Sequence, residues 1–318
     1  MDMKLGCRRI PTLTEIALGL DMITEVRGIL PELDIYTQAF IECFAKRWDG
    51  GEGEYVIHGR DLDFKGIKPF FNRMRVIVST YENNRVECTG EYDPWDPDKK
   101  GRFDVQIRLR LDYIPGYRPL ALVRLKTCFA HEITHAYENL YRARHGAPTL
   151  GSQKYNERYK KFDPDDSIHN MSNYNGTCIA NAARNMYYFI ESVERNAFVA
   201  SLRYELEPYV TAGTIKNSQE LLKYALSSGT QLGKNYRIIQ RSYEKMFKDW
   251  FKVKDGLDLV DFQQLNSDLN DLLGKDYSLG EDMIKIQKDW TKFEKIFKTK
   301  VLKVVSDVWN DFGPDNED

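Results

Sequence analysis

The chain has 318 residues, of which 42% are apolar and 13% aromatic. This is enough to fill one large or two modest hydrophobic cores, and it excludes wholesale disorder. The 46 Lys and Arg residues against 48 Asp and Glu residues leave a net charge of −2. That balance argues against a nucleic-acid-binding protein and against a polybasic membrane-surface protein. We therefore expect no nucleic-acid or membrane partner.

Three further features concern the compartment. No apolar run reaches the ~18 residues of a membrane span, and the N-terminus lacks the pattern of a signal peptide. The five cysteines are widely spaced without a CxxC pair, which favours unpaired, mostly buried thiols in a reducing compartment. We expect a cytoplasmic protein, or a virion-associated one if a phage encodes it.

The first part of the chain predicts helices followed by strands. Residues 12–48 have the pattern of two helices broken at Pro31. A short strand is predicted at 54–58 and a longer, alternating one at 73–81. The clearest strand is 103–113, where apolar or aromatic residues alternate with polar ones over eleven residues. Such alternation predicts one buried and one solvated face.

The rest of the chain is predicted to be helical. A helix from about 120 to 144 precedes a polar loop at 145–177, and a second helix covers about 178–206. From 217 to 312 the pattern is helical throughout. Apolar residues recur there at intervals of three and four, typical of a core-facing stripe: Ile286, Trp290, Phe293, Phe297, Val301, Val305, Val308 and Phe312.

Together these elements predict an α+β fold. A small antiparallel or mixed sheet would pack on the helix at 120–144, and a mostly helical C-terminal region would follow. We assign residues 1–50 to N-terminal helices, 51–210 to a domain built around the sheet and 211–318 to a helical domain. An assembly partner could bind through this last region.

His131, Glu132 and His135 form an HExxH motif inside the helix predicted at 120–144. Side chains at positions i and i+4 share one helical face, so both imidazoles can bind one metal ion. On a helical wheel the apolar residues cluster on the opposite side: Leu122, Leu125, Phe129, Ile133, Ala136 and Leu140. The histidines are therefore predicted to face a cleft rather than the core.

A catalytic zinc ion needs a third protein ligand and one open position. On the helix predicted at 178–206, Glu194 falls between Ile190 and Phe198. A carboxylate on such an apolar face is costly unless it is paired or binds a metal. Glu191 lies at the edge of that face, where solvation is cheap. We favour Glu194 as the third ligand and keep Glu191 as the alternative, with an ion-paired structural glutamate as the competing interpretation.

With HExxH on one helix and a glutamate on a later one, the chain resembles the zincin metallopeptidases, and among them the gluzincins. The run Glu194-Arg195-Asn196-Ala197 matches the Glu-x-x-Ala pattern of that clan, but Phe198 stands where Asp or Asn is usual. The stretch also resembles phage and bacterial metallopeptidases of unassigned substrate. The resemblance covers about residues 54–206. It implies that residues 51–210 form a zincin-like catalytic domain with one Zn²⁺ per chain.

The resemblance implies a zinc-dependent metallopeptidase acting on a peptide or protein. Zinc would lower the pKa of a bound water toward ~7 and polarise the scissile carbonyl. Glu132 would act as general base and pass the proton to the leaving amine, while the strand at 102–113 would pair with extended substrate. The alternative is a non-catalytic zincin-fold assembly or binding protein, for example a phage virion component, although a pure scaffold has no physical need for Glu132.

Overall fold

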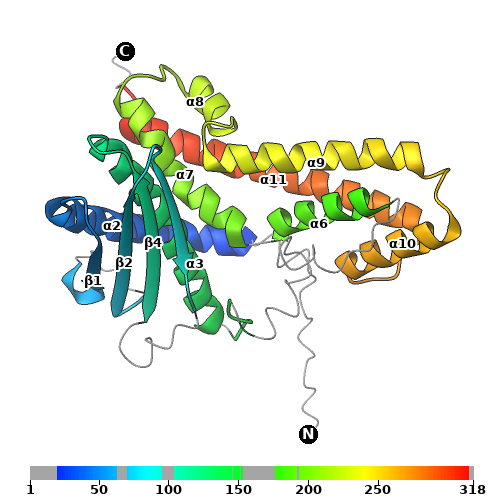
Figure 1. Ribbon diagram of the computed structural model, residues 1–318, viewed down its shortest axis with the longest axis horizontal. Helices are drawn as coiled ribbons and strands as arrows, with labels where there is room; N and C mark the ends of the chain where they lie inside the picture. The colour runs from blue at the N-terminus through cyan, green and yellow to red at the C-terminus, as the bar shows by residue number, and fades with distance from the viewer. Residues whose placement is uncertain are drawn as a thin grey trace, which may run out of the picture.

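The structure, a computed structural model, has an α+β fold, as predicted (Figure 1). It describes residues 20–62, 70–94, 104–144, 146–150, 152, 176–191 and 193–314, without the side chains of 20–31, 191 and 193. In chain order the elements are α2 (Leu20–Arg47), β1 (Gly53–His58), a 3₁₀ turn (Gly59–Asp61), β2 (Arg73–Glu82), β3 (Glu87–Tyr92), β4 (Val105–Tyr113), α3 (Arg118–Arg144), α6 (Thr177–Glu191), α7 (Val193–Thr211), α8 (Ser218–Ala225), α9 (Gln231–Val253), α10 (Leu259–Leu273) and α11 (Leu279–Phe312).

The strands form a mixed four-stranded sheet in the order β1-β2-β4-β3. Strand β2 runs parallel to β4, whereas β1 and β3 pair antiparallel with their neighbours. The register sets Val76 opposite Ile107 and Val78 opposite Leu109. Paired residues share one face of a sheet, and these four are all buried. The small mixed sheet and its three predicted strands are thus confirmed, with Phe103 lying outside the described residues.

The sequence pattern does not predict β3, because its residues Glu-Cys-Thr-Gly-Glu-Tyr show no apolar alternation and most of them are exposed. This strand lies at the edge of the sheet, where little of it is covered. Strand β4 lies between β2 and β3 and has strand partners on both sides. The expectation that residues 102–113 pair with substrate is therefore wrong. Within the described sheet, the edge next to α3 that can accept another strand belongs to β3.

A single helix, α2, runs through Pro31, where the sequence predicts a break. Proline inside a helix removes one backbone hydrogen bond and costs about 3 kcal/mol. After Pro31, the rings of Tyr36, Phe40 and Phe44 are fully buried in the core beside the sheet. Burying one large apolar side chain stabilises a fold by about 1.5–3 kcal/mol. Tertiary packing of three such rings therefore outweighs the cost of the proline.

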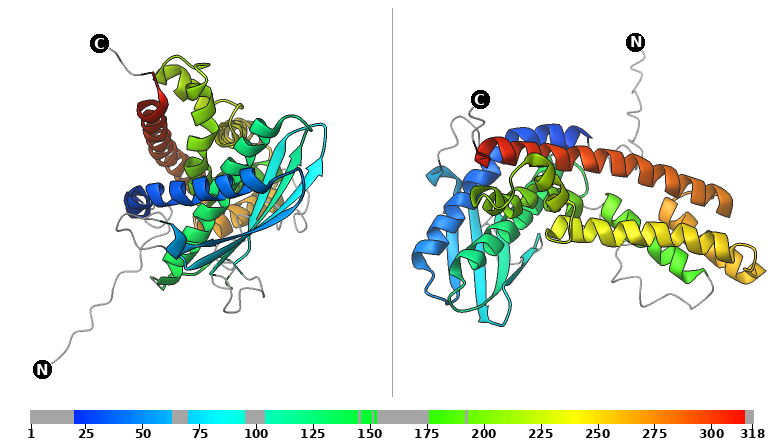
Figure 2. Two further views of the ribbon diagram at one scale, coloured as in Figure 1. Left: turned by 90° about the vertical axis from the view of Figure 1, so that its left-hand side faces the viewer. Right: turned by 90° about the horizontal axis from the view of Figure 1, so that it is seen from above.

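Helices α2 and α3 share one hydrophobic core with the sheet (Figure 2). The rings of Phe40 on α2 and Phe129 on α3 stack with their centroids 4.3 Å apart. On α3, Leu125, Phe129 and Ile133 are fully buried, so the predicted apolar stripe does face the core. The opposite side of α3, which carries the HExxH histidines, packs against α7.

Residues 178–206, predicted as one helix, form two: α6 ends at Glu191 and α7 begins at Val193. Glu194 therefore lies in the first turn of α7, where the positive end of the helix dipole stabilises a carboxylate. Because Ile190 belongs to the other helix, the prediction that Glu194 and Ile190 share one continuous helical face is wrong.

Helices α6 to α11 build a second hydrophobic core, and the long helices α9 and α11 extend away from the sheet (Figures 1 and 2). Ring contacts join these two helices, such as Tyr243 on Trp290 at 4.7 Å between centroids. The predicted stripe on α11 is buried from Ile286 to Val308, with Phe312 partly buried against the same core. Its interpretation as core packing is confirmed.

The predicted domain limits at residues 50 and 210 stay predictions, although α2 shares its core with the sheet and α6 and α7 share theirs with the C-terminal helices. None of the described helices is long and apolar enough to cross a membrane. The four described cysteines are free. Cys43 and Cys178 are exposed and Cys88 and Cys128 half-buried, so the expectation of mostly buried thiols is wrong for them.

Candidate metal centre

His131 and His135 lie one turn apart on α3 and point toward α7. Their Nε2 atoms are 3.1 Å apart, and the rings meet edge to face. His135 is buried and His131 half-buried. The pairing follows directly from the i, i+4 spacing of the motif.

Glu194 of α7 completes a cluster with the two histidines. Its Oε2 lies 3.1 Å from Nε2 of His131, and its Oε1 lies 3.3 Å from Nε2 of His135. The fold thus brings together the three residues that the sequence predicts as ligands. Glu191, the alternative ligand, ends α6, and its side chain lies outside the described part of the structure.

The spacing of the three donor atoms fits a zinc ion. Zinc–ligand bonds of ~2.0–2.1 Å in tetrahedral geometry separate neighbouring donors by about 3.3 Å. Here Nε2 of His131 lies 3.1 Å from Nε2 of His135 and 3.1 Å from Oε2 of Glu194, whereas the other oxygen of that carboxylate, Oε1, lies 3.3 Å from Nε2 of His135. One donor atom from each residue lies within 4.8 Å of the others. Two imidazoles and one carboxylate are also a donor set that zinc accepts readily. The cluster could therefore hold zinc with one position left for another ligand.

The electrostatics of the cluster couple the glutamate to both imidazoles. Burial alone would raise the pKa of Glu194, but the charges and hydrogen bonds of His135 and His131 outweigh it and hold that pKa well below its usual range. Burial would lower the pKa of His135, yet the nearby carboxylates, Glu194 above all, raise it to about 9. Without a metal, the cluster is held together as a carboxylate–imidazolium pair.

Glu132 lies on α3 beside the cluster and faces the edge strand. Its carboxylate accepts a hydrogen bond from the backbone N–H of Tyr92, and it is 6% exposed. Burial raises its pKa, while the charges of His135 and His131 oppose the rise. A raised carboxyl pKa brings the group closer to the range in which a general base works best.

Gly90 of β3 leaves room for the Glu132 side chain. A Cβ atom at this position would lie 2.5 Å from Cγ of Glu132 and 2.9 Å from Sγ of Cys128. No real Cβ atom makes contacts this short, so any larger residue would displace the glutamate. The sequence contains Gly90, but without β3 it gives no sign of this contact.

A buried carboxylate behind the histidines is the functional candidate that the sequence reasoning did not assign. Glu138 is 1% exposed, and its Oε1 accepts a hydrogen bond of 2.7 Å from the amide of Asn196. Among the described residues, Oε2 of Glu138 and Nδ1 of His135 are both buried without a hydrogen-bond partner. The Glu138 charge also contributes to the raised pKa of His135. The sequence does hold a clue to this role. Glu138 follows His135 by three positions, and residues three apart lie on the same side of a helix.

Phe198 occupies the position where the gluzincin pattern has Asp or Asn. Its ring packs against the ring of His131, with the centroids 4.6 Å apart. The contact is apolar, so Phe198 gives His131 no hydrogen-bond acceptor. The polar support behind the cluster comes instead from Glu138 and Asn196.

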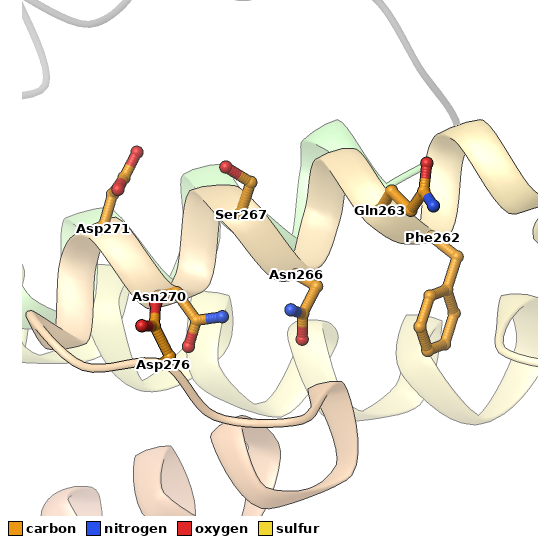
Figure 3. Close-up of a pocket in the computed structure, with 7 residues that line it drawn as sticks. All are labelled: Phe262, Gln263, Asn266, Ser267, Asn270, Asp271 and Asp276. Carbon is orange, nitrogen blue, oxygen red and sulfur yellow. The ribbon is translucent and has the colours of Figure 1, made fainter.

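Two surface pockets lie on the helical region and not at this cluster. One of about 310 Å³ runs along α10 (Figure 3), and another of about 360 Å³ lies beside α9. Neither is lined by His131, His135 or Glu194. The candidate site therefore rests on its donor atoms and not on the size of a cavity.

No protein-family model, no curated protein and no solved structure matches the chain.

Proposed function

We propose that this chain is a zinc-dependent metallopeptidase with a zincin-like, gluzincin-type catalytic unit. One zinc ion per chain would be held by His131, His135 and Glu194. The observation that carries the proposal is the cluster of two imidazole nitrogens and one carboxylate, linked by contacts of 3.1–3.3 Å and built by two helices that lie far apart in the sequence. The buried carboxylate of Glu132 beside that cluster supports hydrolysis over a purely structural metal.

Zinc in such a site supplies a Lewis acid, which lowers the pKa of water and polarises a carbonyl group. Glu132 provides the proton transfers: its carboxylate takes a proton from the attacking water and gives it to the leaving nitrogen. The N–H of Tyr92 holds this carboxylate in place. Glu138 and Asn196 orient the ligands by joining the helices behind them.

The substrate is proposed to be an extended peptide or protein segment that adds to β3, which is an edge strand of the described sheet. Backbone hydrogen bonds to an edge strand bind such a segment with little dependence on its side chains. Tyr92 ends β3 and contacts Glu132 through its backbone. A peptide paired with β3 would therefore pass next to the general base.

Elemental analysis of tag-free protein is the first test. We expect about one zinc per chain in the unmodified protein. His135→Ala and Glu194→Ala should lose it because each removes one of three ligands, whereas Glu191→Ala should keep it. No zinc after purification without chelators, and none after reconstitution, would refute the proposal. If Glu191→Ala loses zinc and Glu194→Ala keeps it, the third ligand is Glu191 and not Glu194.

The second candidate is a non-catalytic zincin-fold assembly or binding protein, such as a virion component. It is favoured by three apolar side chains at the connection between α9 and α10, at the end of the helical region away from the sheet (Figure 1). Phe251, Leu259 and Val260 are 66%, 71% and 72% exposed, and exposed apolar groups of this size favour a partner surface. Glu132→Gln separates the two candidates, since it would lower the rate of hydrolysis by about 10²–10⁴-fold but leave assembly unchanged.

A further inference from the structure

Two cysteines face each other between β3 and α3, next to the proposed catalytic site. Cys88 lies on β3 opposite Leu111 of β4, and Gly90 lies opposite Leu109. Both leucines are buried in the core covered by α3. Residues paired across strands share a face, so Cys88 and Gly90 also face α3.

Cys128 of α3 meets this face of the strand. Its Sγ is 2.9 Å from where a Cβ atom on Gly90 would lie, and Gly90 and Cys88 share the face of β3 that meets α3. The nearby thiol of Cys88, together with burial, raises the pKa of Cys128. Among the described cysteines, these are the two that lie between β3 and α3; Cys43 and Cys178 lie on the separate helices α2 and α6.

Strand and helix are in tight contact at Gly90, two positions from Cys88. Gly90 sits so close to Glu132 that even a methyl group would overlap the side chain. Sulfur atoms in a disulfide are about 2.05 Å apart, much closer than the sulfur atoms of two separate thiols. Linking Cys88 to Cys128 would therefore draw β3 toward α3 and force Glu132 to move.

We propose that Cys88 and Cys128 form a reversible disulfide that fastens the edge strand to the HExxH helix and switches off the hydrolase. The oxidant is a low-molecular-weight disulfide such as oxidised glutathione. One protein thiolate attacks the small disulfide and releases one small thiol. The other protein thiolate then attacks the mixed disulfide and releases the second small thiol. In total, two protein thiols are oxidised by two electrons, two protons are transferred, and one small disulfide is reduced to two thiols.

The linkage can be tested without any assay of activity. Full-length, zinc-loaded protein is incubated with oxidised glutathione, alkylated and digested with trypsin without reduction. We expect a linked pair of peptides, residues 86–99 and 127–142, which disappears after treatment with dithiothreitol. Cys43 and Cys178 serve as controls in the same sample, because exposed single thiols should carry glutathione or the alkylating group. Mixed disulfides alone at Cys88 or Cys128, or links only between chains, would overturn the inference.

The effect on catalysis rests on the proposed function and is measured separately. Oxidised protein should lose peptidase activity by about 100-fold, the loss expected when a catalytic group moves by ~1 Å. It should keep its zinc, because no ligand takes part in the linkage. Cys88→Ser should be active in both glutathione states. If the wild type is an active peptidase and keeps its activity after the disulfide has formed, the proposed switch is wrong. If the linkage forms in a protein that never hydrolyses peptides, the failure lies in the proposed function and not in the disulfide.

Discussion

The side-chain amide of Asn196 donates a hydrogen bond of 2.7 Å to the buried carboxylate of Glu138. Asn196 follows Glu194 by two positions on α7, and Glu138 follows His135 by three positions on α3. The bond therefore joins the two helices that carry the candidate ligands, directly behind the candidate metal centre. Hydrogen bonds to a buried charged group are worth about 1.5–3 kcal/mol, so this contact contributes to the spacing of the donor atoms.

Glu138→Gln is predicted to weaken zinc binding by about 10–100-fold, the usual effect of losing a carboxylate behind a metal-bound histidine. When Nε2 of His135 binds the metal, its Nδ1 carries a proton that needs an acceptor, and the candidate is Oε2 of Glu138, which has no hydrogen-bond partner among the described residues. The metal-free variant should be no less stable than the wild type, because a neutral amide is cheaper to bury than a carboxylate. Competition with a fluorescent chelator measures the affinity.

Glu207→Gln is the matched control for that experiment. Glu207 also joins α7 to α3, through an ion pair of 3.0 Å with Lys126, but it is not part of the cluster. We expect unchanged zinc affinity in this variant. Equal weakening in both variants would mean that Glu138 acts only through general contact between the helices.

Glu132→Gln is predicted to lower kcat by about 10²–10⁴-fold, the usual contribution of a general base. The amide can still accept the hydrogen bond from the N–H of Tyr92, so the backbone contact and the zinc content should be retained. Steady-state kinetics on any peptide that the wild type cleaves, combined with elemental analysis, test this. Full activity in the variant would remove Glu132 from the mechanism.

Gly90→Ala is predicted to impair catalysis while zinc stays bound. The added methyl group would lie 2.5 Å from Cγ of Glu132, and overpacking of this kind costs about 1–3 kcal/mol. The control is Gly280→Ala on α11, where the methyl group meets nothing within 4 Å. This control should be as stable as the wild type, or more stable by about 0.5–1 kcal/mol. Unchanged kcat/KM in Gly90→Ala would contradict the contact between strand and glutamate.

Asp282→Asn is predicted to stabilise the protein in a pH-dependent way. Asp282 is fully buried, and neither carboxylate oxygen has a hydrogen-bond partner among the described residues. Burial, assisted by the charge of Glu281, raises its pKa to about 7, against ~3.9 in an unfolded chain. Between about pH 4 and pH 7 the folded state therefore binds more protons, and stability falls as the pH rises through this window.

The asparagine variant lacks that dependence. Its Tm should exceed that of the wild type at pH 8, by roughly 2–4 °C for each kcal/mol of relief, and the difference should vanish near pH 4. Thermal unfolding at pH 4, 6 and 8 measures it. A difference between the two proteins that does not change with pH would show that Asp282 is not the titrating group.

Several features could be predicted from the sequence because they depend on local periodicity. The 3.6-residue repeat separates the apolar face of α3, with Phe129, from the histidine face, and the two-residue repeat assigns Ile107 and Leu109 to the buried face of β4. The same reasoning finds the buried stripe on α11. Local signals also lead to errors: the proline predicts a break of α2 at Pro31, where packing of Phe40 and Phe44 holds the helix together, and the helical periodicity merges α6 with α7.

The sequence by itself determined that His131 and His135 share one helical face with Glu132 between them, because residues within one turn are held by backbone hydrogen bonds alone. Only the tertiary structure decided that Glu194 meets them across 63 residues, that β3 and not β4 is the edge strand, and that Asn196 supports Glu138. Contacts such as these depend on how the helices and the sheet pack and on the register of the strands. Spacing along the chain carries no information about either.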